Sequence, residues 1–193
     1  FSFYRPGGCL IGARPVDTHL DALQKMGVRV QAKEKGYVVD ATKRHPAMVV
    51  LREFSVTGTE NAMMLAASMP GKTIIKIAAC EPHVEDLGKF LVAMGAKIKG
   101  LGTNVLEIQG TKKLKGVKHA VIPDANEAAT FLILGVATGS PITVKNAREE
   151  HLDLVLEKLR EFGADFSVKK NEITVVPAKK LRAVTKLDTR VYP

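Results

Sequence analysis

The 193-residue sequence is poor in the residues that build disulfide frameworks and metal centres. It holds only two cysteines, Cys9 and Cys80, and no group of Cys and His has the spacing of a metal site. Its longest apolar runs, at 62–67 and 131–137, are far too short to cross a bilayer, and no charged-then-apolar leader opens the chain. We therefore expect reduced thiols, no metal, no cofactor, no membrane contact and a cytoplasmic location.

Aromatic residues are also scarce, at 5% of the chain with no Trp, whereas the formal net charge is +9. A basic chain favours an anionic partner, either nucleic acid or a small phosphorylated ligand. With so few aromatic side chains there are few platforms on which bases could stack, so a nucleic-acid-binding module is the weaker alternative and no nucleic acid is expected. The lysine runs at 112–115, 169–170 and 179–182 are typical of a solvated face.

Internal repetition organises what is present. Gly27, Gly95 and Gly163 lie 68 residues apart, and each follows an apolar helical pattern. The 68-residue spacing is expected to hold without a gap elsewhere, as it does between Gly71 and Gly139. A duplicated supersecondary unit explains the pattern. The same spacing relates the apolar positions before the three glycines, namely Met26, Met94 and Phe162, and Leu23, Leu91 and Leu159.

Each unit is predicted to be β-α-β-α-β-β, which makes the fold class α/β. The first copy lacks its opening strand and helix, and the fourth has barely begun at Val191. In the third copy the series starts with a strand near Pro123 and a helix over 127–138. In the second copy it comprises a strand ending near Ser55, a helix over 59–68, a strand over 73–77, an amphipathic helix stopped by Gly95, and strands over 96–99 and 105–108.

One loop places a thiol among glycines. Residues 6–14 read Pro-Gly-Gly-Cys-Leu-Ile-Gly-Ala-Arg, and Pro15 follows where a helix is expected to begin. Three glycines let the backbone approach a ligand closely and adopt positive φ, so the loop is interpreted as a ligand loop. Outside such a motif, a lone cysteine such as Cys9 is more often a small buried hydrophobe, the role expected for Cys80.

The pattern Pro-Gly-Gly-Cys-x-Ile-Gly-x-Arg-Pro-Val-Asp-x-His over 6–19 closely resembles the cysteine loop of the UDP-N-acetylglucosamine 1-carboxyvinyltransferase family. The resemblance extends along nearly the whole chain, through 54–56, 59–61, 81–82 and 122–124. It implies an inside-out α/β barrel of six units, three in each lobe, with the active site between the lobes. Residues 1–122 would belong to the first lobe and 123–193 to the second, so the chain is interpreted as an internal fragment.

The resemblance implies transfer of the enolpyruvyl group of phosphoenolpyruvate to the 3-hydroxyl of UDP-N-acetylglucosamine, with release of phosphate. This reaction is the first committed step of peptidoglycan precursor synthesis. Cys9 would donate the proton to the methylene carbon and add covalently to phosphoenolpyruvate, and it would be the residue that fosfomycin alkylates. Arg14 would favour the thiolate and pair bidentately with phosphate.

The resemblance also implies two contacts with the nucleotide sugar. The first is made by the segment after the loop, namely Arg14, Pro15, Val16, Asp17, Thr18 and His19. The second is made by backbone N–H groups at a helix start, over Phe54, Ser55, Val56 and Thr57. Glu53 and Thr57 stand where some members carry Lys and Gly. For His19, ligand contact and a purely structural role both stay open, and Asp124 and Glu127 are interpreted as polar groups at the lobe crossing.

The sister reaction on shikimate 3-phosphate, catalysed by a protein of the same architecture, is the alternative within the enzyme class. That protein lacks the cysteine loop, so Cys9 argues against it. Several groups of the implied site, including the aspartate that acts as base for the sugar hydroxyl, fall outside these 193 residues. The chain alone is therefore expected to bind ligands weakly and not to turn over, because it needs the remaining repeats to complete the site.

Overall fold

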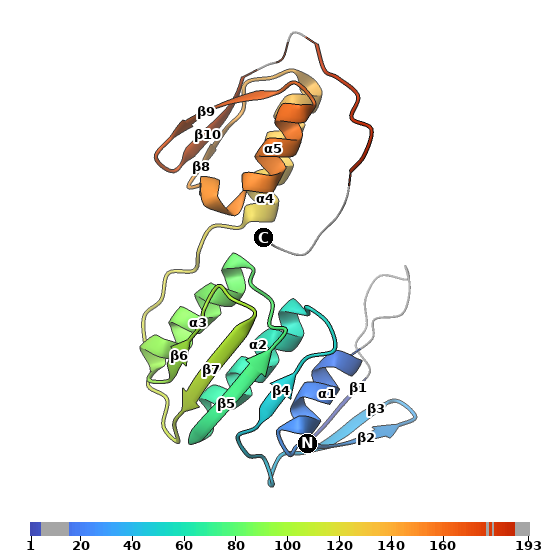
Figure 1. Ribbon diagram of the computed structural model, residues 1–193, viewed down its shortest axis with the longest axis vertical. Helices are drawn as coiled ribbons and strands as arrows, with labels where there is room; N and C mark the ends of the chain where they lie inside the picture. The colour runs from blue at the N-terminus through green and yellow to red at the C-terminus, as the bar shows by residue number, and fades with distance from the viewer. Residues whose placement is uncertain (5–15, 177, 179, 188–193) are drawn as a thin grey trace. The chain divides into compact units, whose positions relative to one another are not determined.

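A computed structural model describes residues 1–4, 16–176, 178 and 180–187 (Figure 1). The chain folds as two compact units, one over residues 1–120 and one beginning at Val121. Each unit packs helices against a β-sheet, so the α/β fold class expected from the sequence is confirmed. The assignment of residues 1–122 and 123–193 to two enzyme lobes stays a prediction.

The described residues of the first unit form two sheets and three helices. Helix α2 packs against α1 on one side and α3 on the other, and it covers strands β5 and β7. The helices are α1 (Asp17–Lys25), α2 (Val56–Ala67) and α3 (Pro82–Met94). An antiparallel sheet has the order β1-β3-β2, with β1 (Ser2–Tyr4), β2 (Arg29–Lys33) and β3 (Gly36–Asp40).

The second sheet of this unit is mixed and has the order β4-β5-β7-β6. Strands β4 and β5 are parallel, because helix α2 connects them, while β7 is antiparallel to both of its neighbours. Their bounds are β4 (Met48–Val50), β5 (Gly71–Lys76), β6 (Lys97–Lys99) and β7 (Val105–Gly110).

The second unit repeats the design with two helices on one antiparallel sheet of order β8-β10-β9. A short 3₁₀ turn, η1 (Glu149–His151), precedes its second helix. The other elements are α4 (Ala125–Thr138), β8 (Thr143–Lys145), α5 (Asp153–Glu161), β9 (Asp165–Lys169) and β10 (Glu172–Val176). No helix in the described part of the chain is long and apolar enough to span a membrane.

The repeat predicted from the glycines is confirmed by the backbone. Gly27, Gly95 and Gly163 have φ of +81°, +117° and +93°, a left-handed conformation that favours glycine. The carbonyl of the residue before each glycine accepts a hydrogen bond from the segment that follows the last strand of its repeat. These bonds join the amides of His45, Lys115 and Arg182 to the carbonyls of Met26, Met94 and Phe162, at 2.9, 2.8 and 2.8 Å.

The expectation of an unbroken 68-residue register is wrong at helices α2 and α4. Their N-caps are Ser55 and Asp124, which are 69 residues apart, and their fully buried residues Met63 and Leu132 keep that spacing. Each helix therefore packs in the register set by its own cap. The shift is absorbed at the far end, because α4 has 14 residues and ends at the left-handed Gly139, whereas α2 has 12 residues.

The strand expected to end near Pro123 is not formed: residues 111–124 contain no strand. The backbone of this segment instead bonds to helix ends: the Thr111 amide donates to the Ala67 carbonyl at 3.0 Å, and the Lys115 amide donates to Met94 at 2.8 Å. Among the described residues, the complete β-α-β-α-β-β series is thus seen only in the second repeat, from β4 to β7.

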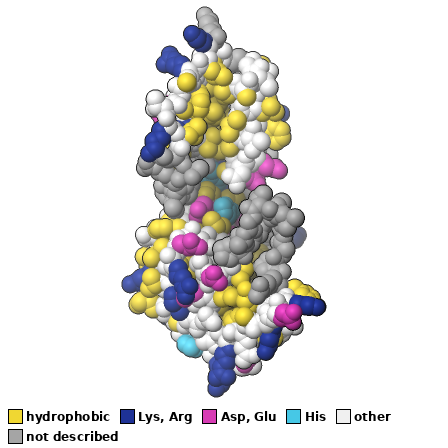
Figure 2. Space-filling model, turned by 90° about the vertical axis from the view of Figure 1, so that its right-hand side faces the viewer, with side chains coloured by type: hydrophobic (Ala, Val, Ile, Leu, Met, Phe, Trp, Pro, Cys, Tyr) yellow, Lys and Arg dark blue, Asp and Glu magenta, His cyan; other side chains and the backbone are white. Residues whose placement is uncertain are grey.

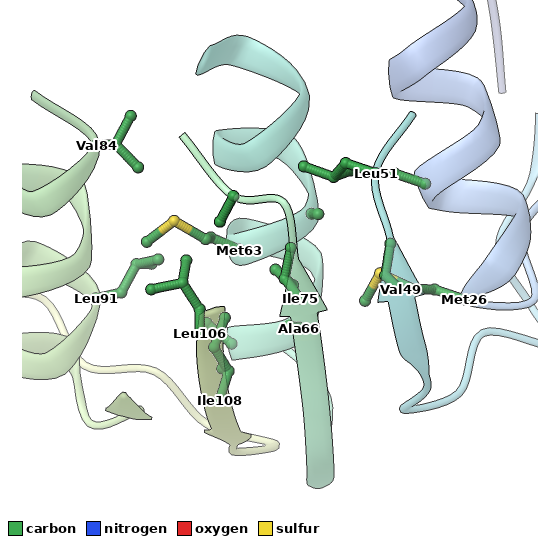
Figure 3. Packing of buried hydrophobic residues seen from close by; sticks show 14 of the residues in the cluster. Met26, Val49, Leu51, Met63, Ala66, Ile75, Val84, Leu91, Leu106 and Ile108 are labelled. Carbon is green, nitrogen blue, oxygen red and sulfur yellow. The ribbon is translucent and has the colours of Figure 1, made fainter. Parts of the chain in front are cut away.

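The core of the first unit lies between α2 and the mixed sheet (Figure 3). Met63 points from α2 toward Val84 and Leu91 of α3, while Ile75 and Leu106 rise from the sheet beneath it. All five side chains are buried. This packing fixes the position of α2, and with it the helix start at Ser55.

Candidate functional site

The predicted site residues divide into two groups. Cys9, Arg14 and Pro15 lie outside the described residues. The remaining ones lie at the starts of two helices that pack together, with Val16, Asp17, Thr18 and His19 at the start of α1, and Phe54, Ser55, Val56 and Thr57 at the start of α2. The structure therefore brings together two segments that are about 35 residues apart in sequence.

Ser55 caps helix α2. Its backbone is extended, with φ −101° and ψ 116°, and its Oγ accepts the Gly58 amide at 3.1 Å. The first N–H groups of a helix have no intrahelical acceptor, and together they carry a partial positive charge. The first turn of α2 contains no acidic residue to compensate this charge. The arrangement can hold an anionic group against backbone N–H donors.

One face of α1 holds the segment that leads into α2. Thr18 donates from Oγ1 to Glu53 Oε1 at 2.8 Å, and Asp21 pairs with Arg52 at 2.9 Å and with Lys25 at 2.6 Å. Burial alone would raise the pKa of Asp21, but hydrogen bonds and charges from Lys25 and Arg52 outweigh it and lower that pKa. The approach to Ser55 is thereby fixed from one side by helix α1.

His19 joins the two helices through both ring nitrogens. Its Nε2 lies 3.1 Å from Thr57 Oγ1, and its Nδ1 lies 2.7 Å from Asn61 Nδ2. The helices can approach this closely because Gly58 has no side chain: a Cβ there would lie 3.2 Å from the Thr18 methyl and 2.9 Å from Ser55 Oγ.

The other side of α2 is tied to the loop after β5. The buried Thr59 hydroxyl donates to the Ser55 carbonyl at 2.7 Å and accepts the Ala79 amide at 3.0 Å. In the same loop Ile77 has a φ of +60°, which is strained for a β-branched residue. The first turn of α2 is thus anchored from both sides.

Two carboxyl groups lie near this loop. Burial raises the pKa of Glu60; His83 acts against that shift, and Glu81 adds to it. Burial and Glu81 also raise the pKa of the Cys80 thiol, which donates to the Ala78 carbonyl at 3.6 Å. A thiol with a raised pKa is a poor nucleophile, which agrees with a non-catalytic role for Cys80. Among the described residues, no group of His, Cys, Asp and Glu could hold a metal ion.

An apolar groove of about 320 Å³ opens beside His19 and Asn61. Its walls come from β1, β3, α1 and α2, and its lining includes Phe1, Phe3, Val16, Leu20, Leu23, Val39 and Met64.

The residues that sequence reasoning missed are Thr59, Glu60 and Asn61, which anchor or flank the α2 start. Their run in the sequence was noted as part of the resemblance, but nothing in the pattern showed which partners they have.

The chain is similar to known proteins along nearly its whole length. Residues 2–190 match the family described as EPSP synthase (3-phosphoshikimate 1-carboxyvinyltransferase). The chain is 45% identical over 190 residues to the UDP-N-acetylglucosamine 1-carboxyvinyltransferase of Campylobacter hominis, covering 97% of this chain and 45% of that protein. It is 40% identical to the protein of that name from Thermodesulfovibrio yellowstonii, again covering 97% of this chain and 45% of that protein. The identity is 46% to that from Koribacter versatilis, over 82% of this chain and 36% of the relative.

Solved structures share the fold. The enolpyruvyl transferase NikO from Streptomyces tendae matches with a TM-score of 0.77 and 23% identity over 88% of this chain and 44% of that chain. EPSP synthase from Acinetobacter baumannii matches with a TM-score of 0.67 and 20% identity, over 89% of this chain and 41% of that one. The chain spans about half the length of the curated relatives in Campylobacter and Thermodesulfovibrio. With a family match from residue 2 to residue 190, and the repeats and the α/β fold in place, this chain belongs to the EPSP synthase (3-phosphoshikimate 1-carboxyvinyltransferase) family.

Proposed function

We propose that the protein to which residues 1–193 belong transfers the enolpyruvyl group of phosphoenolpyruvate to the 3-hydroxyl of UDP-N-acetylglucosamine and releases phosphate. The observation that carries this proposal is the 45% identity, over 97% of the chain, to a relative named for that reaction. The cysteine loop at 6–19 supports the same substrate. The family description names the shikimate reaction, which makes that reaction the second candidate.

The start of α2 supports a role in holding the nucleotide sugar. Ser55 leaves the helix N-terminus without a carboxylate cap, so the backbone N–H groups of Val56 and Thr57 can face a diphosphate. Val16, Asp17, Thr18 and His19 come within reach of the same place because α1 packs on α2. We assign Val16, Asp17 and Thr18, with Phe54 and with Arg14 and Pro15 from the loop, to the binding of UDP-N-acetylglucosamine, and His19 to the support of this surface.

The chemistry is assigned to Cys9 and Arg14. The thiol of Cys9 gives its proton to the methylene carbon of phosphoenolpyruvate while the sugar hydroxyl attacks the neighbouring carbon and loses its own proton. Loss of phosphate and of one methyl proton then restores the alkene as an enolpyruvyl ether. Arg14 stabilises the thiolate and pairs with the phosphate that leaves. Both substrates are anionic metabolites, which fits the cytoplasmic location expected from the sequence.

Apolar surfaces that none of the described residues covers support a need for the remaining repeats of the family fold. Phe131, Ile133 and Leu134 on α4 and Leu154 on α5 are about half exposed. Hydrophobic side chains gather on the second unit in Figure 2. In the first unit, the groove beside α1 exposes another apolar wall. Surfaces of this kind are typical of faces that a further element covers. We therefore propose that residues 1–193 alone bind weakly and do not turn over.

The proposal is tested with the protein expressed from its complete reading frame. Phosphate release is measured with phosphoenolpyruvate and either UDP-N-acetylglucosamine or shikimate 3-phosphate. We expect release only with the nucleotide sugar, and a loss of at least about a hundredfold in Cys9→Ala, because general acid catalysis contributes factors of that order. The matched control is Cys80→Ala, which should keep its rate. Release with shikimate 3-phosphate alone would overturn the assignment.

A further inference from the structure

We infer that His19 is a positioning residue that fixes the first turn of α2 onto α1 and is neutral, with its single ring proton on Nε2. This inference rests on the proposed function, because the first turn of α2 is where the nucleotide sugar is proposed to bind. It assigns the polar atoms of His19 to the protein and leaves the ligand to the backbone groups that His19 holds in place.

The partner of His19 Nδ1 decides the tautomer. In the structure the Asn61 amide presents Nδ2 to His19 Nδ1 at 2.7 Å, and an amide nitrogen only donates, so this orientation of the amide corresponds to a bare, accepting Nδ1. The ring proton of the neutral imidazole then sits on Nε2. That N–H donates to Thr57 Oγ1 at 3.1 Å, since a hydroxyl oxygen accepts as readily as it donates.

The two contacts span one helical turn. Thr57 is the second residue of α2, Asn61 lies four residues later, and His19 is the third residue of α1. One ring therefore connects two successive turns of α2 to the first turn of α1. Since Thr57 carries one of the proposed phosphate-binding amides, the ring sets where these amides point. A lost contact should loosen ligand binding more than it slows chemistry.

The tautomer is tested by nitrogen-15 NMR of the imidazole in the complete protein at neutral pH. We expect the unprotonated resonance to belong to Nδ1. Asn61→Asp replaces the donor with a carboxylate that only accepts, so the proton should move to Nδ1 or the ring should become doubly protonated. Asn171→Asp, in the exposed turn between β9 and β10, adds the same charge and should leave the His19 signals unchanged. A proton on Nδ1 in the unmodified protein overturns the inference.

The positioning role is tested by kinetics. His19→Leu removes both contacts, and we expect the KM for UDP-N-acetylglucosamine to rise about tenfold, the order of one lost hydrogen bond, with kcat changed less than about twofold. His19→Gln offers an acceptor and a donor at a similar spacing and should restore most of the KM. A fall in kcat at unchanged KM, or no difference between Leu and Gln in equally stable variants, contradicts the inference.

The two proposals fail in different ways. If UDP-N-acetylglucosamine does not bind the unmodified protein, the proposed function fails, while the NMR result on the tautomer still stands or falls by itself. If the nucleotide sugar binds and turns over but His19→Leu keeps an unchanged KM, only the positioning role fails. Melting temperatures of all variants separate either result from a loss of folding.

Discussion

Helices α2 and α4 hold the same place in two successive repeats but differ at their N-termini. Ser55 caps α2 through a neutral hydroxyl, whereas Asp124 caps α4 through a carboxylate that accepts two amides, at 2.7 and 3.2 Å. The first turn of α4 also contains Glu127, and that of α2 contains no acidic residue. The positive helix end is therefore compensated in the second unit and free for an anion in the first.

Their sides differ as well. Helix α2 is held by His19 on one side and by the loop at Ala79 on the other. Helix α4 exposes Phe131, which occupies the position of the fully buried Ala62 in the cap register. The repeat thus builds the same packing twice, while the residues outside the buried face give α2 a helix start without an acidic residue and leave exposed apolar side chains on α4.

The largest expected effect compares the buried face of α2 with the exposed face of α4. Met63→Ala should lower the free energy of unfolding by about 2–5 kcal/mol, because it opens a cavity at a fully buried site. Phe131→Ala should change the stability of the 193-residue chain by no more than about 0.5 kcal/mol, because the ring is half exposed. Urea titrations measure both. In the complete protein Phe131→Ala should cost more; an equal cost in both forms would remove the argument that α4 lacks a neighbour.

The next effect exchanges the caps. Ser55→Asp should keep helix α2 capped but weaken binding of UDP-N-acetylglucosamine by at least about tenfold, because a carboxylate then occupies the positive helix end and repels the diphosphate. Calorimetry with the complete protein measures the affinity. The reciprocal change Asp124→Ser should leave it unaltered. An unchanged affinity in Ser55→Asp would exclude the α2 start as the diphosphate site.

Much of this fold could be predicted from the sequence because apolar periodicity and glycine act locally. The glycine after each amphipathic helix marked a left-handed cap. The site was harder, since His19 finds its partners 38 and 42 residues away, and no local pattern encodes that pairing. The register between α2 and α4 was missed because each helix follows its own cap, which a fixed repeat length cannot represent.

A smaller effect compares equivalent glycines. Gly95→Ala meets no atom within 4 Å and should cost about 1 kcal/mol from its positive φ alone. Gly27→Ala should cost more, because its Cβ would lie 2.4 Å from the His45 ring and 2.5 Å from the Lys43 carbonyl. Thermal unfolding of the two variants provides the ranking. An equal loss of stability in the two variants would show that residues 43–45 can move to accommodate the added Cβ.

The smallest effect concerns charge. The pKa of Glu60 is raised above its ordinary value of 4.5 in the folded chain, first by burial, so its ionised form destabilises the fold at neutral pH. Glu60→Gln should raise the melting temperature by about 1–2 °C at pH 7, and the gain should vanish below about pH 4, where the carboxyl is neutral in both states. Glu127→Gln should act in the opposite direction at pH 7, because it removes a charge that favours a helix start. A higher melting temperature in both variants at pH 7 would contradict the difference expected between Glu60 and Glu127.

The central claim is that Cys9 is the reactive thiol of a UDP-N-acetylglucosamine enolpyruvyl transferase. The most direct measurement is the intact mass of the complete protein after fosfomycin treatment, with and without UDP-N-acetylglucosamine, followed by peptide mapping. We predict a single adduct that maps to Cys9 and forms faster when the nucleotide sugar is present. No adduct, or an adduct on Cys80, would contradict the account.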